Sequence, residues 1–299
     1  MINSLAQDGQ RNCPICGTGS LTPCGDESWS FWGVDYTLLQ CASCGSATTY
    51  PAPDDATVER VYRESFDYRW YRDHYAAKLS DARTRIAEHG ERLGRRVIDF
   101  GGGLGYFSEA AKACGHDSMT LDSFAGSKGG GSAPADTVVA LHVLEHANDL
   151  DRAMSSICGL LRPNGHLLVA VPNYRGAGYR RWGMRWVWAQ PPLIHIHHFT
   201  ATGLRCLLER HGIGDCHISY HDRWDANHVA DVTGAEAFRR RDAAWGLWPW
   251  CRFAIYRKWV ARRNAALRNL ALNQSLNIDM PAEDRAELEI YGRYEGGQP

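Results

Sequence analysis

The sequence predicts an α/β fold, with a doubly wound parallel sheet preceded by a small module that a metal ion holds together. Three observations carry this prediction: short apolar runs that alternate with helical patterns from residue 95 onward, a glycine-rich turn after the first of these runs, and two Cys-x-x-Cys pairs near the N-terminus. Strands separated by helices in this way are typical of βαβ units on a parallel sheet. The cysteine pairs indicate a separate unit held together by ligands.

The expected elements follow one another regularly along the chain. Strands are expected at residues 97–100, 118–121, 137–141 and 166–171, and helices at 106–114, 150–161 and 200–211. Pro163-Asn-Gly is expected to end one of these helices, and Pro172 the strand after it. Nearer the N-terminus, Asp54 is a good N-cap for a helix that runs toward Ser65, and residues 78–92 form a charged helical stretch.

The composition is that of a globular protein with balanced charge. The 299 residues include 33 Lys and Arg against 34 Asp and Glu, so the chain has no overall positive field that would attract nucleic acid. Residues 1–12 lack the apolar core of a signal peptide, and no run approaches the roughly 18 apolar residues that cross a bilayer. We therefore expect a cytoplasmic protein with reduced cysteines.

Four paired cysteines predict a zinc ribbon. Cys13 and Cys16 form one Cys-x-x-Cys knuckle and Cys41 and Cys44 the other; each knuckle is followed by glycine, and 24 residues (17–40) separate them. Tetrahedral zinc takes four thiolates of this kind, and the glycines permit the tight turns. Four cysteine ligands leave no open position on the ion, so the predicted zinc is structural. A redox dithiol would need only one such pair.

A glycine-rich loop follows the strand at 97–100. Its alternate glycines let the loop backbone approach a ligand closely after the first strand of a doubly wound sheet. The dinucleotide-binding fingerprint fails here, because Tyr106 stands where that fingerprint requires glycine or alanine. The run Asp-Phe-Gly-Gly-Gly-Leu-Gly instead resembles motif I of class I S-adenosylmethionine-dependent methyltransferases. This resemblance implies a Rossmann-like fold and cofactor contacts by Asp99, Gly101, Gly102, Gly103 and Gly105.

Later segments extend this resemblance in the order that the family shows. Asp122 ends the next strand, where an acidic residue of such enzymes binds the ribose hydroxyls. Residues 136–146 resemble the fourth-strand motif, whose Leu141 and His142 would line the methionine end of the cofactor. Residues 161–173 resemble the turn and fifth strand that follow.

The segment before the fourth strand departs from the family pattern. Only 13 residues (123–135) separate Asp122 from Asp136, which leaves little room for the usual third strand, and no adenine-binding acid is assigned. The cysteine knuckles, Pro51-Ala-Pro53 and the run from His195 to Thr200 also resemble bacterial methyltransferases with an N-terminal zinc ribbon. That wider group acts in sugar, polysaccharide and natural-product pathways.

Histidines in two segments are the candidate general bases. Methyl transfer to a hydroxyl requires alignment of the nucleophile and removal of its proton, for which histidine is suited near neutral pH. We expect His195, His146 and His198 at the carboxyl edge of the sheet, where open α/β folds bind ligands. Each could instead be a hydrogen-bonded structural residue, and Glu145 could orient His146 or cap a helix.

The expected domains are a zinc ribbon at 1–52, a helical linker or cap at 53–92, the methyltransferase domain at 93–235 and a helical extension at 236–299. A Trp- and Arg-rich insertion at 174–190 either walls an anionic acceptor, such as a nucleotide diphosphate, or packs as a lid. A basic helix expected at 253–273 could contact an anionic membrane surface, a phosphorylated acceptor or a partner chain, or form a solvated face.

The resemblance implies an S-adenosylmethionine-dependent methyltransferase that acts on a small molecule, through a hydroxyl of a sugar, nucleotide sugar or secondary metabolite. Nitrogen and carbon acceptors stay open, because no residue pattern fixes the nucleophile. Two alternatives are an RNA base methyltransferase that recognises RNA with its zinc ribbon, and a non-catalytic scaffold that keeps the fold. Steeply salt-dependent binding to RNA would favour the first, and a lack of S-adenosylmethionine binding the second.

Overall fold

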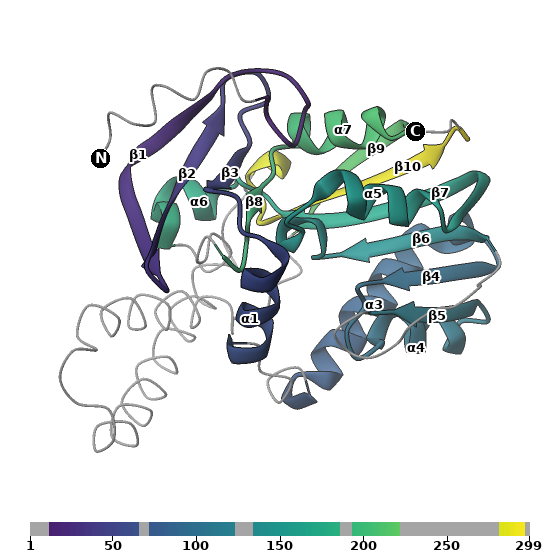
Figure 1. Ribbon diagram of the computed structural model, residues 1–299. Coiled ribbons are helices and arrows are strands. Elements are labelled where there is room, and N and C mark those ends of the chain that lie inside the picture. Colours follow the sequence, from purple (N-terminus) through teal and green to yellow (C-terminus); the bar gives the residue numbers. More distant parts are fainter. Residues whose placement is uncertain (1–11, 66–71, 123–133, 186–192, 222–280, 297–299) are drawn as a thin grey trace, which may run out of the picture. The chain divides into compact units, whose positions relative to one another are not determined.

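The computed structural model describes residues 12–65, 72–122, 134–185, 193–221 and 281–296 (Figure 1). The chain divides into two compact parts. The larger part comprises Met1–Pro172, Pro192–Ser219 and Leu288–Pro299, and the smaller comprises Asn173–Pro191 and Tyr220–Glu287. Among the described residues, no helix is long and apolar enough to cross a membrane.

A six-stranded sheet lies in the larger part, in the order β5-β4-β6-β7-β10-β9 (Figure 1). Its strands are β4 (Arg96–Phe100), β5 (Asp117–Leu121), β6 (Ala135–Leu141), β7 (Leu161–Pro172), β9 (Ile213–His221) and β10 (Glu287–Tyr294). β4 pairs in parallel with β5 on one side and β6 on the other, and β6 pairs in parallel with β7. The predicted doubly wound α/β fold is confirmed, with a topological switch point between β4 and β6. Ligands of such sheets bind outside the carboxyl ends of the strands at this point.

Helices α3 (Tyr75–His89) and α4 (Tyr106–Ala113) contribute apolar side chains to the core beside this sheet. In α3, Leu79, Ala82 and Ile86 recur at helical spacing, and they meet Phe107 of α4 and Val139 of β6 in one buried cluster. A short 3-10 helix, η2 (Gly90–Leu93), then leads from α3 into β4. The apolar run of β4 is therefore covered by the helices that flank it in sequence.

The C-terminal strand β10 is fixed to α3 by buried ion pairs. Arg85 Nη1 donates to Glu289 Oε2 at 2.6 Å, both side chains are 1% exposed, and His89 Nε2 lies 2.9 Å from the other carboxylate oxygen. The amino-acid pattern does not predict this strand within the expected helical extension, because Glu287 and Glu289 occupy two of its buried positions. Their charges give the segment a polar pattern. The helix expected at 253–273 lies outside the described residues.

The boundary between α5 and β7 differs from the expected one. α5 (Leu150–Cys158) ends three residues before β7 begins at Leu161, whereas the sequence predicts a helix to 161 and a strand from 166. Pro163-Asn-Gly lies inside β7 as an irregularity, because the pairing with β6 shifts between Ala135 and Thr137. Asn164 adopts a left-handed φ of 59° there. The turn residues therefore distort the strand and do not end the helix.

The N-terminal segment forms a second, four-stranded sheet in the order β1-β2-β3-β8. Its strands are β1 (Leu21–Phe31), β2 (Val34–Cys41), β3 (Ala47–Tyr50) and β8 (His197–His198), all paired antiparallel. We call residues 12–50 the cysteine module. Trp32 and Gly33 join β1 to β2 with φ values of 50° and 82°, which suit a two-residue hairpin turn. β8 comes from a distant part of the chain, residues 194–200, which we call the histidine segment. The cysteine module therefore shares its sheet with this segment.

Two helices flank this junction, and each begins at a side-chain cap. α1 (Asp55–Ser65) starts after Asp54, whose Oδ1 accepts from the Thr57 amide at 2.8 Å, as the sequence predicts. α7 (Ala201–Arg210) starts after Thr200, whose hydroxyl accepts from the Gly203 amide at 3.0 Å. The cap at Thr200 thus fixes the point where the histidine segment becomes helix.

The smaller part contains α6 (Ala177–Trp182) and the 3-10 helices η4 (Gly183–Arg185) and η6 (Ala282–Asp284). Asn173 holds it together by donating from Nδ2 to the carbonyls of Glu283 at 2.9 Å and Arg285 at 2.8 Å. Arg180 pairs with Asp284 at 2.5 Å. Trp186 and Trp188 of the expected aromatic wall lie outside the described residues.

Candidate active site

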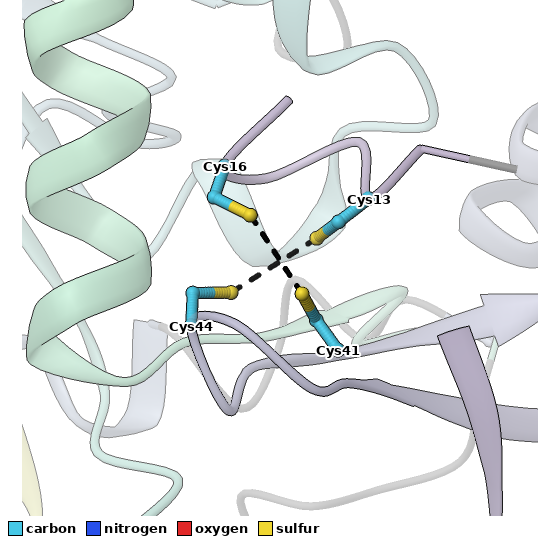
Figure 2. Close-up of side chains that lie close together, drawn as sticks. All are labelled: Cys13, Cys16, Cys41 and Cys44. Atoms are coloured by element: carbon cyan, nitrogen blue, oxygen red, sulfur yellow. Dashed lines mark hydrogen bonds between the residues drawn. The ribbon is translucent and has the colours of Figure 1, made fainter. Parts of the chain in front are cut away.

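Four buried cysteine side chains converge in the cysteine module (Figure 2). The Sγ atoms of Cys13 and Cys44 lie 4.0 Å apart, and those of Cys16 and Cys41 lie 3.7 Å apart. Zinc–sulfur bonds of about 2.3 Å in a tetrahedron would place the sulfurs about 3.8 Å from one another. A disulfide would need about 2.05 Å. The four thiols therefore fit a tetrahedral metal ion and form no disulfide.

The two cysteine pairs adopt the same knuckle geometry. The Gly17 amide donates to the Cys13 carbonyl at 2.8 Å, and the Gly45 amide donates to the Cys41 carbonyl at 2.9 Å. Both glycines have left-handed φ values, 77° and 71°. A side chain in that conformation costs about 1–2 kcal/mol, which explains why each pair is followed by glycine.

Protons are distributed unequally within the cluster. The hydrogen bond with Cys13 lowers the pKa of the Cys44 thiol to about 5, whereas the bond to Cys44 raises the pKa of Cys13. Burial raises the pKa of Cys41. A divalent cation would allow all four groups to be thiolates at once, because metal ligation requires the deprotonated form.

The glycine loop leaves β4 in a conformation that favours glycine. Gly101, Gly103 and Gly105 have φ values of 67°, 55° and 81°. The Gly103 amide donates to Asp122 Oδ2 at 2.8 Å, which ties the loop to the end of β5. An ideal Cβ at Gly103 meets no atom within 4 Å, so contacts with the described residues do not require glycine there. The remaining reasons for glycine are the left-handed backbone and the close approach of a ligand.

Gly101 and Gly102 are fixed by their immediate neighbours. A Cβ at Gly101 would lie 2.7 Å from Cγ2 of Val143, and one at Gly102 would lie 2.1 Å from Oδ2 of Asp99. Val143 follows β6, so the loop after β4 touches the turn after β6. Val143 has no signal in the sequence, because only its contact with Gly101 marks it. The glycine loop is therefore adjacent to the turn after β6, residues 142–146, which we call the histidine turn.

Asp99 is buried beneath the glycine loop. Burial raises the pKa of its carboxyl to about 7, against the hydrogen bonds from the Ser108 amide and the Thr120 hydroxyl, and the charge of Asp122 adds to the increase. Asp99 thus changes its protonation state near neutral pH. Leu141, which is also expected to contact the cofactor, ends β6. It is partly buried and packs against the core.

The turn after β6 presents a buried carboxylate. His142 has a φ of 56°, uncommon for a residue other than glycine, and its Nδ1 lies 3.2 Å from Glu145 Oε1. Burial acts to raise the pKa of Glu145, but the hydrogen bond with His142 and the charges of His146, His142 and His195 hold it below its usual value. Glu145 Oε2 has no hydrogen-bond partner among the described residues. Strained backbone of this kind is typical of functional sites.

His146 and His195 meet from two different segments. Their ring centroids lie 4.8 Å apart at an interplanar angle of 76°. Nδ1 of His146 lies 2.6 Å from the Ile194 carbonyl, which can only accept, so this nitrogen carries the hydrogen. Nε2 of neutral His146 therefore holds the lone pair, and the residue is partly exposed. His195 is buried, with 5% of its surface exposed.

The same cluster has the composition of a metal site. Glu145, His146 and His195 each offer one ligand atom, and these atoms lie within 4.8 Å of one another. Two histidines and a carboxylate bind divalent transition metals in other proteins. Metal analysis can therefore distinguish a histidine base from a histidine ligand.

His197 and His198 form β8, and both are buried. Burial lowers the pKa of His197 to about 4 and that of His198 to about 3, so both are neutral and weakly basic near pH 7. His197 Nδ1 lies 2.9 Å from Thr48 Oγ1 of β3. Of the three histidines predicted as catalytic, His146 and His195 are in ring contact, and His198 pairs with Ala47 in the sheet of the cysteine module while the charges of His195 and Glu145 act on its pKa.

Comparisons with known proteins agree with this arrangement. Residues 71–215 match a family model described as a methyltransferase domain. No curated protein sequence matches the chain.

Several solved structures are similar to the chain at low identity and with TM-scores below 0.5. An S-adenosylmethionine-dependent methyltransferase from Archaeoglobus fulgidus has a TM-score of 0.44 and 17% identity, with 76% of this chain and 100% of that chain covered. Phosphoethanolamine N-methyltransferase 2 from Haemonchus contortus has a TM-score of 0.47 and 9% identity, with 90% and 71% covered. A possible histamine N-methyltransferase from Thermotoga maritima has a TM-score of 0.41 and 13% identity, with 80% and 98% covered. At these values the neighbours indicate nothing about the acceptor.

The matched region contains β4 to β7, the glycine loop, the turn after β6 and the histidine segment. Residues 71–215 of the chain are therefore similar to a methyltransferase domain.

Proposed function

We propose that this protein transfers a methyl group from S-adenosylmethionine to a hydroxyl of a small molecule, such as a sugar, a nucleotide sugar or a secondary metabolite. The observation that supports this most directly is the adjacency of the glycine loop and the histidine turn, where Gly101 packs against Val143. A hydroxyl must lose its proton during the transfer, so a base beside the donor site suits such an acceptor.

The donor site is proposed at the carboxyl ends of β4, β5 and β6. Asp122 would bind the ribose hydroxyls, and Gly101 and Gly103 would let the loop backbone approach the methionine part. His142 and Leu141 at the end of β6 would line the methionine end. Bound S-adenosylmethionine supplies a methyl group on a positively charged sulfur, and the acceptor oxygen displaces that sulfur in line.

His146 is the proposed general base. Its Nδ1 donates to the Ile194 carbonyl, which leaves Nε2 to accept the proton of the acceptor hydroxyl. Glu145, held ionised by its histidine neighbours, would stabilise the imidazolium that forms. His195 packs edge-on against His146 and is proposed to orient it. The lowered pKa of His198 favours a structural role for that residue.

We further propose that the cysteine cluster holds a structural zinc ion. The sulfur separations of 3.7 and 4.0 Å and the burial of all four cysteines support this assignment. A site with four cysteine ligands has no open coordination position, so the ion would stabilise the module and take no part in methyl transfer. Reduced, metal-bound cysteines suit a cytoplasmic protein.

We propose that the acceptor is anionic, because residues 174–190 are rich in arginine. An anionic group, such as a diphosphate, would be bound by arginines of this segment. Arg180 already pairs with Asp284, so the binding would depend on the other arginines. The proposed contact of the basic stretch at 253–273 with a membrane rests on sequence alone, because that stretch lies outside the described residues.

Titration calorimetry with S-adenosylhomocysteine tests the donor site. Gly103→Leu fills the space above the loop, and Gly115→Leu is a matched control, because Gly115 also has a left-handed φ, 90°, and open surroundings. We expect the wild type and Gly115→Leu to bind, and Gly103→Leu to bind more than about tenfold more weakly, a loss above about 1.4 kcal/mol. Circular dichroism checks that all three fold. Absence of binding by the wild type, or equal affinity of Gly103→Leu, would contradict the proposal.

A further inference from the structure

We propose that the cysteine module positions the catalytic histidines, and that Thr48 and Ser46 are positioning residues through which it acts. The module holds the segment of residues 194–200, and this segment in turn places His195 and the hydrogen-bond acceptor of His146. The inference rests on the proposed function, in which His146 is the base.

A continuous series of main-chain hydrogen bonds joins the module to the histidine turn. The Thr49 amide of β3 donates to the Ile196 carbonyl at 2.8 Å, and the Ile196 amide donates to the Glu145 carbonyl at 2.7 Å. On the other side of His195, the Ile194 carbonyl accepts from His146 Nδ1 at 2.6 Å. The backbone is therefore fixed on both sides of His195. Ile194 is held by the histidine turn, and Ile196 is held by both the histidine turn and the cysteine module.

Buried side chains of the module hold the same segment. Thr48 Oγ1 lies 2.9 Å from His197 Nδ1. Ser46 Oγ accepts from the Thr200 amide at 3.0 Å, and the Thr200 hydroxyl donates to the Cys44 carbonyl at 2.7 Å. Ser46, Thr48 and Thr200 are 0%, 6% and 3% exposed. Loss of such a partner leaves a buried polar group unsatisfied, so these bonds constrain the segment strongly.

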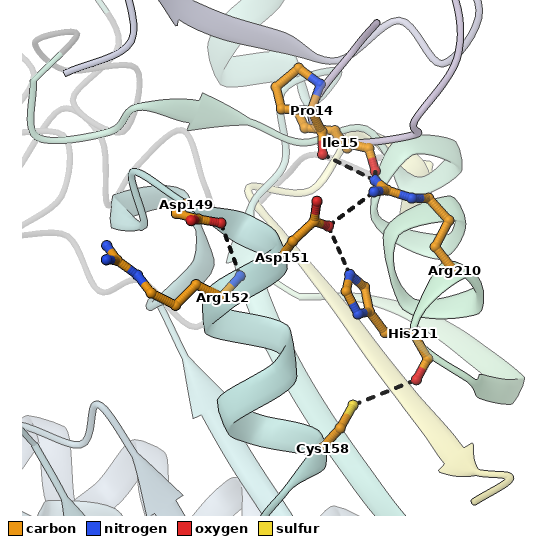
Figure 3. A network of polar contacts seen from close by, with 8 residues as sticks. All are labelled: Pro14, Ile15, Asp149, Asp151, Arg152, Cys158, Arg210 and His211. Atoms are coloured by element: carbon orange, nitrogen blue, oxygen red, sulfur yellow. Dashed lines mark hydrogen bonds and ion pairs between the residues drawn. The ribbon is translucent and has the colours of Figure 1, made fainter. Parts of the chain in front are cut away.

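The far end of α7 is attached to the other cysteine knuckle (Figure 3). Arg210 Nη1 donates to the carbonyls of Pro14 at 3.1 Å and Ile15 at 3.0 Å, the two residues between Cys13 and Cys16. Its Nη2 lies 2.9 Å from Asp151 Oδ1 of α5. α7 is thus bound to the second knuckle where it begins and to the first knuckle where it ends. A change in the cysteine cluster would therefore move the helix that follows the histidine segment.

The tautomer of His146 reports this positioning directly. His146 keeps its hydrogen on Nδ1 because the Ile194 carbonyl lies opposite that nitrogen. If the segment shifts, the acceptor is lost, and the hydrogen distributes between the two ring nitrogens. A role of the module in stability alone would leave the tautomer of the folded protein unchanged.

The test compares Thr48→Val with Thr37→Val in zinc-loaded, full-length protein labelled with ¹⁵N-histidine. Thr37 lies in the neighbouring strand β2, and its hydroxyl bonds to the Glu27 carbonyl at 3.2 Å, away from the histidines. We expect the wild type and Thr37→Val to show His146 as the Nδ1–H tautomer, and Thr48→Val to show a mixture of tautomers with shifted His195 signals. Zinc content and affinity for S-adenosylhomocysteine should be the same in all three proteins.

Ser46→Ala provides an independent second variant, because it removes the bond to the Thr200 amide and leaves Thr48 intact. Unchanged His146 and His195 ring signals in both Thr48→Val and Ser46→Ala would overturn the inference. If His146→Ala retains full turnover, the proposed base is wrong, and the ring signals still decide whether the module positions the segment. The two failures are therefore distinguishable.

Discussion

The cysteine cluster and the histidine cluster both consist of side chains that can bind a metal ion. They differ in symmetry and in whether their polar atoms all have partners within the cluster. The cysteines come from two equivalent knuckles, and all four are buried. The histidines come from unrelated segments, His146 is partly exposed, and Glu145 Oε2 is without a hydrogen-bond partner among the described residues. One cluster is closed by its own residues, and the other has capacity for a further molecule.

This difference is the basis of the roles proposed for the two clusters. A closed set of identical ligands stabilises a fold, because the ion has no free position. An asymmetric set with an ionised, buried carboxylate suits proton transfer, because burial and neighbouring charges give its members different pKa values. The hydrogen bonds between β3 and the histidine segment connect the cysteine module to the histidine cluster, as the proposed positioning role requires.

The largest expected effect is the loss of the closed cluster. Cys41→Ser should remove zinc and unfold residues 12–50, because structural zinc contributes about 10–16 kcal/mol to folding such units. Elemental analysis and hydrogen exchange measure both results. Cys24→Ser is the matched control, since Cys24 is an exposed cysteine of the same module. Zinc retained by Cys41→Ser, or two zinc ions in the wild type, would break the comparison and point to Glu145, His146 and His195 as ligands.

The next effect concerns the open cluster. His146→Ala should lower kcat by about 10²–10⁴-fold, the range of general base catalysis, and leave the affinity for S-adenosylhomocysteine nearly unchanged. The measurement is release of S-adenosylhomocysteine with an acceptor found by screening sugars and nucleotide sugars. His217→Ala, an exposed histidine of β9, is the control. Equal turnover of the two variants would remove His146 from the mechanism.

Asp99, which is buried beneath the glycine loop, makes the stability of the protein depend on pH. Its folded-state pKa of about 7 lies above the ordinary 3.8, so its contribution to stability is full below pH 3.8 and is lost as the pH rises through about 7. Asp99→Asn should therefore gain stability relative to the wild type over this range, by up to about 4 kcal/mol.

Denaturant unfolding at a series of pH values measures the Asp99 effect. Asp35→Asn, at an exposed position of β2, should follow the wild-type curve. Parallel curves for Asp99→Asn and the wild type would show that Asp99 does not titrate in this range.

The smallest effect is expected at the attachment of α7 to the first knuckle. Arg210→Ala should lower the free energy of unfolding by about 1–2 kcal/mol, because two carbonyl acceptors lose a charged donor that is partly exposed. Arg205→Ala removes an exposed arginine from the same helix and should change stability by less than about 0.5 kcal/mol. Equal unfolding curves for the two variants would mean that Arg210 contributes nothing to this attachment.

The sequence predicts those features of the fold that depend on local pattern. The runs at 97–100 and 137–141 become β4 and β6, and Asp54 caps its helix, because each depends on residues close in sequence. The meeting of the glycine loop with the histidine turn also follows from the sequence, since the carboxyl ends of parallel strands share one edge of the sheet.

The remaining features depend on partners that are distant in sequence. Glu289 is buried in β10 because Arg85 lies opposite it, 204 residues away. The tautomer of His146 depends on the Ile194 carbonyl, 48 residues away and without any side-chain signature. His198 is predicted as catalytic because it is a histidine of the same segment as His195. Its pairing with Ala47 and its burial, which distinguish it from His146, depend on residues distant in sequence.

Ring spectra of ¹⁵N-histidine-labelled protein during titration with S-adenosylhomocysteine would show whether the glycine loop and the histidine turn form one site. The account predicts that the His142 and His146 signals shift on saturation, while the exposed His217 stays in place. Saturable binding that leaves His142 and His146 unmoved would contradict the account, because the ligand would then occupy a site away from the histidines.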